Sequence, residues 1–543
     1  GILGMRMKSV AAIALLLSAT AEASMQLGVN THFDQGWQLS RLNQVADTKA
    51  QGIRDTITWG KIESRPGRYD FGTAASAYAT EACRRGISLL IGLHPRNKLY
   101  DGGRTVQSPA GRRAFSAYVA TLADHFPCIV GFEIGNEINS KAPNSPGAIE
   151  PASYVALIRD IRAALKPRHP QIANLPGSTQ SVAIGYLERL FAAGLLPLVD
   201  GIVVHPYHAF PERLPREFAR LRIAMARYGQ PKPVWASEFG LYYKSPDLAP
   251  AHALKAITAM SAAGTTRADW YALIDEPWFP NMGLFTDKTP KPALDSFRLA
   301  ITRLLSAGDA HRIETGDPLT FVYRFGAGSY VMWGDRAIEF AGNPTLLDAR
   351  GHKIQKPSRL TPDPIILEGD TRWQLGPVGL LADTMWGYGE PGLSYLAPDA
   401  HGRMEVLDWI DGTWASHIGL AARPNFRVMP GTISVGGINA GELVERFTAN
   451  AKGNVRIGGC FQALGAPVHV KITHDDNIVY SAIIAGRSET ASILTTLAPG
   501  TRIEFRYSAT TANGPQLLER RVRILTVEGG ARPLCVPEMT ARP

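Results

Sequence analysis

Two glutamates lie in segments whose residue types and spacing suit catalysis. Glu137 ends the run Phe132-Glu-Ile-Gly-Asn-Glu137, and Glu238 lies within Val234-Trp-Ala-Ser-Glu-Phe-Gly240. Each glutamate belongs to a short apolar stretch of the kind that forms a buried strand. Glycoside hydrolysis requires two carboxylic groups that flank one bond, because one donates a proton to the leaving oxygen while the other attacks the sugar carbon or activates water. We therefore expect Glu137 and Glu238 to act as a pair.

The elements that must position this pair alternate regularly from residue 26 to 306. We expect eight strands at 27–31, 53–58, 87–93, 129–134, 172–175, 201–205, 234–238 and 270–275. Amphipathic runs between them predict helices at 74–85, 112–125, 152–165, 212–228 and 250–262, with a closing helix at 292–305. This count predicts an α/β fold, a (β/α)8 TIM barrel, in which catalytic residues lie at the carboxyl ends of the strands. A doubly wound open sheet is the alternative, but no G-x-G-x-x-G follows the first strand.

The pattern changes after about residue 310. Short alternating runs, separated by Gly, Pro, Asn and Asp, occur at 319–325, 330–333, 338–340, 468–472, 478–484 and 503–507. This spacing is typical of antiparallel sandwiches. We therefore expect a catalytic barrel at 24–308, a small β domain at 309–368, and an accessory β-sandwich or jelly-roll domain at 369–543 that is a candidate for carbohydrate binding.

Several segments resemble a known family of enzymes. Asn136-Glu137 on strand four and Glu238-Phe-Gly240 on strand seven resemble the large clan of retaining (β/α)8 glycosidases. The run Trp59-Gly-Lys-Ile-Glu-Ser-Arg-Pro-Gly-Arg-Tyr-Asp-Phe71 is similar to that clan's W-x-x-I-E-x-x-x-G-x-Y-D-F pattern. Later segments that resemble the clan are His205-Pro-Tyr207, Asp275-Glu-Pro-Trp278, Gly283-Leu-Phe285 and Lys291-Pro-Ala293. Glycoside hydrolase family 39, including its exopolysaccharide-degrading members, is most similar, and family 5 is next. Ile138 departs from the common Asn-Glu-Pro ending of strand four.

The resemblance implies roles for nine residues. Glu137 would be the acid/base and Glu238 the nucleophile, while Asn136 would bind the sugar 2-hydroxyl. Tyr207 would donate a hydrogen bond to Glu238 and keep it ionised, and Arg54 would add positive charge beside the same carboxylate. The sugar subsite would be shaped by His94, His205, Trp59 and Trp278.

Some of these residues have a purely structural alternative. Arg54 could pair with a barrel carboxylate alone, and Trp59 could pack on the next helix. His94 and His205 could be core histidines with satisfied hydrogen bonds. Glu133 lies four residues before Glu137, so at ~3.3 Å per strand residue we expect it roughly 13 Å below the mouth, in the polar interior.

Other polar and aromatic residues are weaker candidates for a site. Asp275 and Glu276 are possible third carboxylates, although strand-eight positions more often line the sugar site. In the C-terminal region the aromatic candidates for sugar stacking are Trp373, Trp386, Tyr388, Trp409 and Trp414. Packing is the favoured interpretation for this group.

The N-terminus and the cysteines predict export. Met5-Arg-Met-Lys8, the apolar run 10–17 and Ala21-Glu-Ala23 form a secretory signal pattern, and the four residues before Met5 precede the expected start. We therefore expect residues 1–23 to be removed and the protein to be secreted or periplasmic. No C-x-x-C occurs among the four cysteines, so we expect the disulfides Cys83–Cys128 and Cys460–Cys535, with buried free thiols as the alternative.

Composition excludes several classes of function. With 543 residues, 45% hydrophobic and 19% charged, the chain has the composition of a globular protein. The net charge of +9 is not concentrated in a basic run, so we expect no nucleic-acid partner. No later stretch has the ~18 apolar residues of a membrane span. Because H-E-x-x-H, G-x-x-x-x-G-K-[ST] and G-x-S-x-G are absent, we expect no cofactor and no metal. We expect a monomer.

These patterns predict a retaining glycoside hydrolase that cleaves a polysaccharide. A bacterial exopolysaccharide is one candidate substrate. Two alternatives stay open. The first is a catalytically silent or matrix-adhesion protein that binds carbohydrate. The second is an exo-acting β-glycosidase or xylosidase that cleaves small glycosides. The identity of the sugar depends on loops such as 96–111, 140–151 and 244–249.

Overall fold

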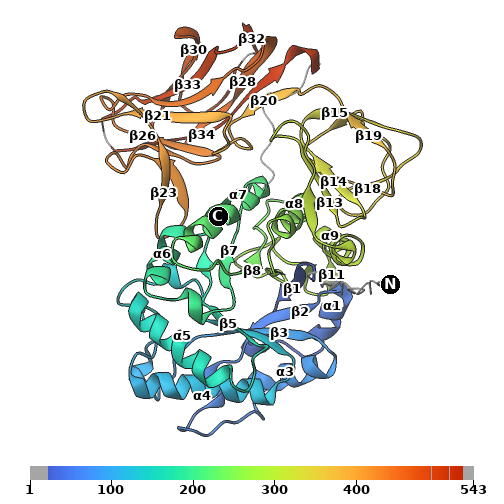
Figure 1. The fold of residues 1–543 in the computed structure, drawn as a ribbon, viewed down its shortest axis with the longest axis vertical. Coiled ribbons are helices and arrows are strands. Elements are labelled where there is room, and N and C mark those ends of the chain that lie inside the picture. The colour runs from blue at the N-terminus through green and yellow to red at the C-terminus, as the bar shows by residue number, and fades with distance from the viewer. Residues whose placement is uncertain (1–22, 491, 513, 530–543) are drawn as a thin grey trace, which may run out of the picture.

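The computed structural model describes residues 23–490, 492–512 and 514–529 (Figure 1). The expected signal segment therefore lies outside the described residues, apart from Ala23. Among the residues that are described, no helix combines the length and the apolar character needed to cross a membrane.

The first sheet is built from parallel strands whose residues are buried almost without exception. Val234–Phe239, for example, is buried along its whole length. Helices cover the outside of such a sheet and side chains fill its inside, so its strands are nearly continuous apolar runs. The strands are β1 (Gln26–Asn30), β2 (Gly52–Thr56), β3 (Ser88–Leu93), β4 (Ile129–Ile134), β5 (Ala173–Pro176), β6 (Thr179–Gln180), β7 (Ile202–His205), β8 (Val234–Phe239) and β9 (Arg267–Trp270).

The order of these strands closes the sheet into a barrel. Hydrogen bonding follows β5-β4-β3-β2-β1-β9-β8-β7-β6. The two ends of this series are consecutive in the chain, because only Gly177 and Ser178 separate β5 from β6. β5 and β6 are therefore two parts of one barrel strand, so the nine segments form eight barrel strands and the predicted (β/α)8 barrel is confirmed.

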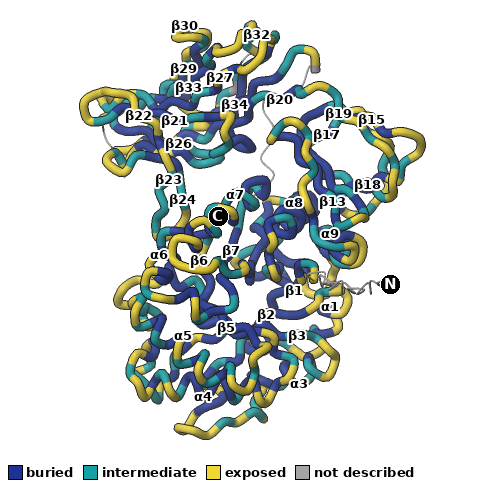
Figure 2. Tube along the Cα trace, viewed as in Figure 1, coloured by how far each residue is buried: buried dark blue, intermediate teal, exposed yellow. Residues whose placement is uncertain are grey.

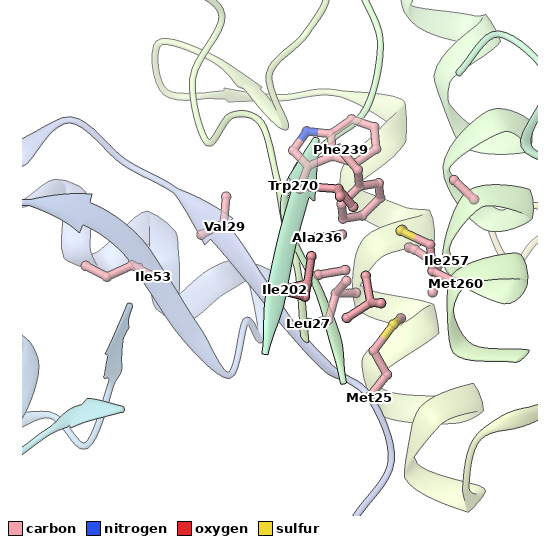
Figure 3. Packing of buried hydrophobic residues seen from close by; sticks show 14 of the residues in the cluster. Met25, Leu27, Val29, Ile53, Ile202, Ala236, Phe239, Ile257, Met260 and Trp270 are labelled. Carbon is pink, nitrogen blue, oxygen red and sulfur yellow. The ribbon is translucent and has the colours of Figure 1, made fainter. Parts of the chain in front are cut away.

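Helices cover the outside of the barrel (Figure 1). They are α1 (Arg41–Thr48), α2 (Trp59–Ile62), α3 (Ala74–Arg84), α4 (Pro109–His125), α5 (Pro151–Leu165), α6 (Ile184–Ala192), α7 (Leu214–Ala226), α8 (Ala249–Ala262) and α9 (Pro292–Leu299). α4 shows why such segments begin where they do: Ser108 Oγ accepts a hydrogen bond from Gly111 N at 3.0 Å, and Pro109 is the first helical residue. Figure 3 shows Ile257 and Met260 of α8 packed against Leu27 and Ala236 of the strands.

The last barrel strand differs from its prediction. It was expected at 270–275, but β9 spans Arg267–Trp270. Two charged residues interrupt its apolar pattern, and they are buried because Arg267 Nη2 pairs with Asp269 Oδ1 at 2.8 Å inside the barrel. A Cβ on Gly28 would lie 2.1 Å from Asp269 Oδ1, so glycine on the neighbouring strand makes room for the ion pair.

One predicted disulfide is present. Cys83 and Cys128 are joined, with a Cα–Cα distance of 5.2 Å, which links the end of α3 to the segment before β4. Cys535 lies outside the described residues, so its pairing with Cys460 stays a prediction.

A smaller antiparallel unit follows the barrel. One sheet has the order β12-β13-β14-β18-β16, and a second has the order β17-β15-β19. Because β19 pairs with β15, this unit extends to residue 375 rather than ending at 368. Its strands are β12 (Ala310–Arg312), β13 (Phe321–Phe325), β14 (Tyr330–Trp333), β15 (Arg336–Phe340), β16 (Thr345–Leu347), β17 (Arg359–Leu360), β18 (Ile365–Glu368) and β19 (Trp373–Leu375).

The C-terminal region is an antiparallel sandwich. One sheet contains β20, β23–β26, β28, β31, β32 and β34, the other has the order β22-β21-β27-β33-β29-β30, and one apolar cluster draws on both (Figure 2). The predicted fold class, a barrel followed by all-β sandwich structure, is confirmed. The strands are β20 (Leu380–Asp383), β21 (Leu393–Pro398), β22 (Met404–Val406), β23 (Asp408–Asp411), β24 (Ser416–Gly419), β25 (Arg427–Val428), β26 (Thr432–Val435), β27 (Leu443–Thr448), β28 (Gly453–Ala463), β29 (Val468–His474), β30 (Asn477–Ile484), β31 (Arg487–Glu489), β32 (Ile493–Leu497), β33 (Arg502–Ala509) and β34 (Gln516–Thr526).

Candidate active site

Two glutamates and a histidine meet at the carboxyl ends of the barrel strands. Glu137 follows β4, His205 ends β7 and Glu238 lies near the end of β8. One side-chain oxygen or nitrogen atom of each residue lies within 4.8 Å of the corresponding atoms of the other two. The barrel thus brings together two carboxylates that are far apart in the sequence.

The backbone at Glu137 has an unusual conformation. Glu137 has φ 44° and ψ 52°, in the left-handed region that residues with a Cβ rarely adopt. The Glu137 N–H donates to Ser178 Oγ at 3.2 Å. Gly177 allows this close approach, because a Cβ there would lie 2.5 Å from the Ile134 carbonyl oxygen. Strained conformations of this kind concentrate at functional sites.

Both oxygens of Glu238 accept hydrogen bonds. Arg54 Nη1 donates to Oε1 at 2.8 Å, and the Tyr207 hydroxyl donates to Oε2 at 2.6 Å. Burial, followed by the charge of Glu238, holds the pKa of Tyr207 well above its usual range, so the phenol keeps the proton that it donates. The two donors fix the orientation of the Glu238 carboxyl group at the end of β8.

Glu133 is linked to Glu238 through Arg54, which donates hydrogen bonds to both carboxylates. Its side chain is fully buried, as expected for the polar interior. Arg54 Nε donates to Glu133 Oε2 at 2.9 Å and Arg54 Nη2 donates to Oε1 at 3.1 Å, while Ser237 Oγ donates to Oε1 at 3.1 Å. Arg54 therefore serves both proposed roles at once, because it pairs with a barrel carboxylate and also contacts Glu238.

His205 and Glu137 share one proton. Ser237 donates its hydroxyl proton to Glu133, so its oxygen accepts from His205 Nε2, which lies 2.9 Å away. His205 Nδ1 lies 3.0 Å from Glu137 Oε1. A hydrogen bond at that distance needs one proton, either on Nδ1 with Glu137 ionised or on Glu137 with Nδ1 bare. The hydrogen bond from His205, together with smaller contributions from nearby cations, lowers the pKa of Glu137 against the opposing effect of its partial burial.

The same three groups are close enough to hold a metal ion, but their hydrogen bonds oppose it. Both oxygens of Glu238 already accept from Arg54 and Tyr207. The guanidinium charge of Arg54, 2.8 Å from Glu238, repels a cation. The arrangement is better suited to proton transfer and nucleophilic attack.

The remaining predicted residues divide into two groups. Asn136 and His94 line a pocket of about 200 Å3 together with Arg54 and Glu238. Trp59 is 1% exposed and stacks on Tyr100 with 5.2 Å between ring centroids, so it packs in the core and the expectation that it contacts a sugar is wrong. Trp278 is 66% exposed and lies outside the lining of the pocket and of the adjoining cleft.

Several residues of the site were not predicted. Asn30, at the end of β1, accepts a hydrogen bond from Arg54 at 2.9 Å. His32 and Tyr271 each contact Glu276 Oε1, at 2.6 and 2.7 Å, and both line the pocket. Each of these residues lies within two positions of the end of a strand, which is the signal that could have identified them.

A larger cleft of about 950 Å3 adjoins the pocket and contains both Glu137 and Glu238. Its barrel side includes Tyr207, Tyr242 and Phe279, and the rings of the last two stack at 4.4 Å between centroids. The other side comes from the C-terminal sandwich. The lining residues from that region are Trp414, Ala415, Met429, Pro430, Gly431, Thr432, Leu464 and Glu519.

Comparison with known proteins supports the fold. No protein-family model and no curated protein sequence matches the chain. A family 39 glycoside hydrolase from the gut symbiont Bacteroides cellulosilyticus WH2 is 17% identical, with a TM-score of 0.54 over 64% of this chain and 81% of that chain. A family 39 β-xylosidase from Caulobacter crescentus is 15% identical, with a TM-score of 0.46 over 66% of this chain and 98% of that one.

A family 5 enzyme of subfamily 18 from Streptomyces cattleya, solved in complex with GlcNAc, is 21% identical, with a TM-score of 0.42 over 52% of this chain and 80% of that chain. At these identities the likeness to the Bacteroides protein shows a shared fold.

Proposed function

We propose that this protein is a retaining glycoside hydrolase. The observation that carries the proposal is the distance of at most 4.8 Å between carboxylate oxygens of Glu137 and Glu238 at the mouth of the barrel. Retaining enzymes hold their two carboxyl groups about 5–5.5 Å apart, whereas inverting enzymes need about 6.5–9.5 Å to admit a water molecule. The fold shared with a family 39 glycoside hydrolase is consistent with this chemistry.

In the first step, Glu238 attacks the anomeric carbon and forms an ester bond as the bond to the leaving oxygen breaks. The Arg54 and Tyr207 hydrogen bonds hold the carboxylate of Glu238 in position for this attack. The proton shared by Glu137 and His205 passes through Glu137 to the leaving oxygen.

In the second step, Glu137 accepts a proton from water as the water attacks the same carbon, and the ester bond to Glu238 breaks. Asn136 Oδ1 accepts hydrogen bonds from Arg54 at 2.8 Å and Ser178 at 3.4 Å. Its amide nitrogen is therefore the end that is oriented for a sugar hydroxyl, such as the 2-hydroxyl next to the reacting carbon.

The substrate we propose is a polysaccharide outside the cytoplasm, such as a bacterial exopolysaccharide. Two observations support it. The cleft of about 950 Å3 extends well beyond the pocket that holds the carboxylates, so it has room for more than one sugar unit. The Cys83–Cys128 disulfide is typical of proteins in an oxidising compartment, which fits a secreted or periplasmic location.

A covalent trap tests the proposed chemistry. The wild-type protein is screened against purified xylans, mannans, β-glucans and bacterial exopolysaccharides, and product size separates internal cleavage from release of end units. A 2-deoxy-2-fluoro glycosyl fluoride of the sugar so identified is then added. We expect mass spectrometry to find it esterified to the peptide that contains Glu238, with no label in Glu238→Gln. Binding without turnover or label would indicate a silent carbohydrate-binding protein instead.

A further inference from the structure

A hairpin of the C-terminal sandwich reaches the mouth of the barrel. It consists of β23, β24 and the turn 412–415 between them, and Figure 1 shows β23 extending from the sandwich toward α6. The approach is close, because a Cβ on Gly185 of α6 would lie 2.2 Å from the Asp411 carbonyl oxygen. The hairpin is therefore packed directly on the barrel.

Side chains of the catalytic loops fix the turn of this hairpin. Asn139 Nδ2 donates to the Thr413 carbonyl oxygen at 2.8 Å, and Ser181 Oγ donates to the Trp414 carbonyl oxygen at 2.7 Å. Asn139 lies two residues after Glu137. The turn is thus tied to the same loop that carries the proposed acid/base.

Arginines of α7 hold the base of the hairpin. Arg220 Nη2 contacts both carboxylate oxygens of Asp411, at 2.9 and 3.0 Å, and its guanidinium lies 4.2 Å from the ring centroid of Trp409. One helical turn earlier, Arg216 pairs with Glu390 at 2.5 Å. These contacts on one face of α7 hold the hairpin in a fixed position relative to the barrel.

A second turn of the sandwich, 429–432, completes this side of the cleft. Arg520 Nη1 donates to the carbonyl oxygens of Met429 and Pro430, at 3.0 and 2.7 Å. Arg520 is 1% exposed and its guanidinium also pairs with Glu445, so these donors are held in place. Turns 412–415 and 429–432 together are called the sandwich wall below.

The exposed aromatic residue of the sandwich wall is Trp414. Trp414 is among the residues that line the cleft containing both glutamates, and it is 49% exposed. Two other aromatic residues of the C-terminal region, Trp386 and Tyr388, are by contrast 5% and 2% exposed and serve as core residues. An indole ring left partly bare in a cleft offers a large flat apolar surface with a polar edge, which suits the face of a sugar ring.

We propose that the sandwich wall forms the leaving-group side of the substrate cleft and that Trp414 binds a sugar ring beyond the bond that is cleaved. This inference rests on the proposed hydrolase function. The side is assigned from the anchor at Asn139, because the leaving oxygen must lie next to Glu137 and the wall is joined to that loop. The substrate class it implies is an oligosaccharide or polysaccharide with at least one sugar unit on the leaving side.

Comparing two kinds of substrate isolates this subsite. Oligosaccharides of two to six units, from the polymer that the wild type cleaves in the screen above, place sugars beyond the bond. A glycosyl fluoride of the same sugar has only a fluoride ion there. We expect Trp414→Ala to lower kcat/KM for the oligosaccharides by about tenfold or more, mainly through KM, and for the fluoride by a much smaller factor.

Two further variants control for indirect effects. Trp414→Phe keeps an aromatic face and should recover most of the oligosaccharide activity. Ile483→Ala removes a side chain that is 65% exposed on β30 of the same sandwich, and it should change neither substrate's kcat/KM. Thermal unfolding of each variant shows that the fold is retained.

The possible failures are distinguishable. Equal losses by Trp414→Ala on both substrates, or no loss on the oligosaccharides, would overturn the proposed subsite while the hydrolase function stands. A wild-type protein that hydrolyses no glycoside and forms no Glu238 adduct would overturn the hydrolase function, and the subsite with it.

Discussion

Two buried arginine–glutamate clusters, one in the barrel and one in the C-terminal sandwich, use similar chemistry in different ways. Arg520 donates through Nε and Nη2 to the two oxygens of Glu445, at 2.8 and 2.7 Å. Arg54 makes the same two-point contact with Glu133. In both clusters burial opposes the guanidinium charge, but the carboxylates raise the pKa of the arginine above its ordinary value.

The difference lies in the remaining donors. Arg520 Nη1 is directed to backbone carbonyl oxygens, so one cation faces one carboxylate and the charges balance. Arg54 Nη1 is directed to a second carboxylate, Glu238, so one cation faces two carboxylates. The excess negative charge lies at the edge of the pocket, where the sugar carbon becomes positive in the transition state. The balanced pair of Arg520 and Glu445 therefore stabilises the fold, whereas the second carboxylate beside Arg54 serves catalysis.

Replacing one glutamate with glutamine in each cluster should separate the catalytic role from the structural role most strongly. Glu238→Gln removes the attacking oxygen and should lower kcat by about 10⁴-fold or more, as loss of a nucleophile does in other enzymes. Its fold should persist, because Arg54 keeps Glu133 as its partner. Glu445→Gln should keep the kcat of the folded protein. Steady-state rates on the glycosyl fluoride, corrected for the folded fraction, give kcat for both variants. Comparable losses of kcat in Glu238→Gln and Glu445→Gln would contradict the division into a catalytic and a structural cluster.

Replacing Glu137 should lower the rate less than replacing Glu238, because a substrate with a better leaving group does not need the acid. Glu137→Ala should lower kcat/KM for oligosaccharides by about 10²–10⁴-fold, and less for a dinitrophenyl glycoside whose leaving group needs no proton. Azide should restore part of the activity and yield a glycosyl azide of retained configuration. An azide product of inverted configuration would show that Glu238 does not form the intermediate.

Breaking the Arg520–Glu445 pair of the sandwich should lower the free energy of unfolding more than changing Glu238 in the barrel. Glu445→Gln leaves the buried Arg520 cation without its charge partner, and breaking a buried ion pair in this way costs about 3–5 kcal/mol. We expect a clearly lower free energy of unfolding in denaturant for Glu445→Gln and a much smaller change for Glu238→Gln. If Glu238→Gln were the less stable of the two, the distinction between the clusters would be wrong.

Much of the barrel could be predicted because its strands are buried on both faces. Val234–Phe239 is apolar apart from Ser237 and Glu238, so the strand and its exceptional residues are visible in one pattern. The sequence places the last strand three residues too late at its start and five at its end, because the buried Arg267–Asp269 pair looks like exposed polar sequence. Trp59 belongs to a segment that resembles the clan, and for that reason the sequence predicts a sugar contact. Its ring instead packs on Tyr100.

The sandwich wall could not be predicted from local sequence. The Asn139–Thr413 contact joins residues 274 positions apart, and the Ser181–Trp414 contact joins residues 233 positions apart. Nothing in the residues around Trp414 distinguishes it from the buried Trp386. Contacts with Phe321 of β13 and Lys255 of α8 cover Trp386, whereas Trp414 lies in the turn that packs on the barrel mouth and stays half exposed.

The smallest effect concerns the proton that Glu137 shares with His205. The alkaline limb of the pH dependence of kcat/KM reports loss of the proton that the acid/base must donate. The hydrogen bond from His205, with smaller contributions from nearby cations, lowers the pKa of Glu137. His205→Gln removes the contribution of the imidazole, so the pKa of Glu137 should rise.

We therefore expect the alkaline limb of His205→Gln to move to higher pH on the oligosaccharides, whose leaving oxygen needs the proton of Glu137. His94→Gln is the matched control, because His94 lines the pocket without a hydrogen bond to Glu137 among the described contacts, and its alkaline limb should stay in place. A limb that stays in place or moves to lower pH in His205→Gln would contradict the role of His205 in lowering the pKa of Glu137. The hydrogen bond between the two residues would then orient the carboxyl group without changing its ionisation.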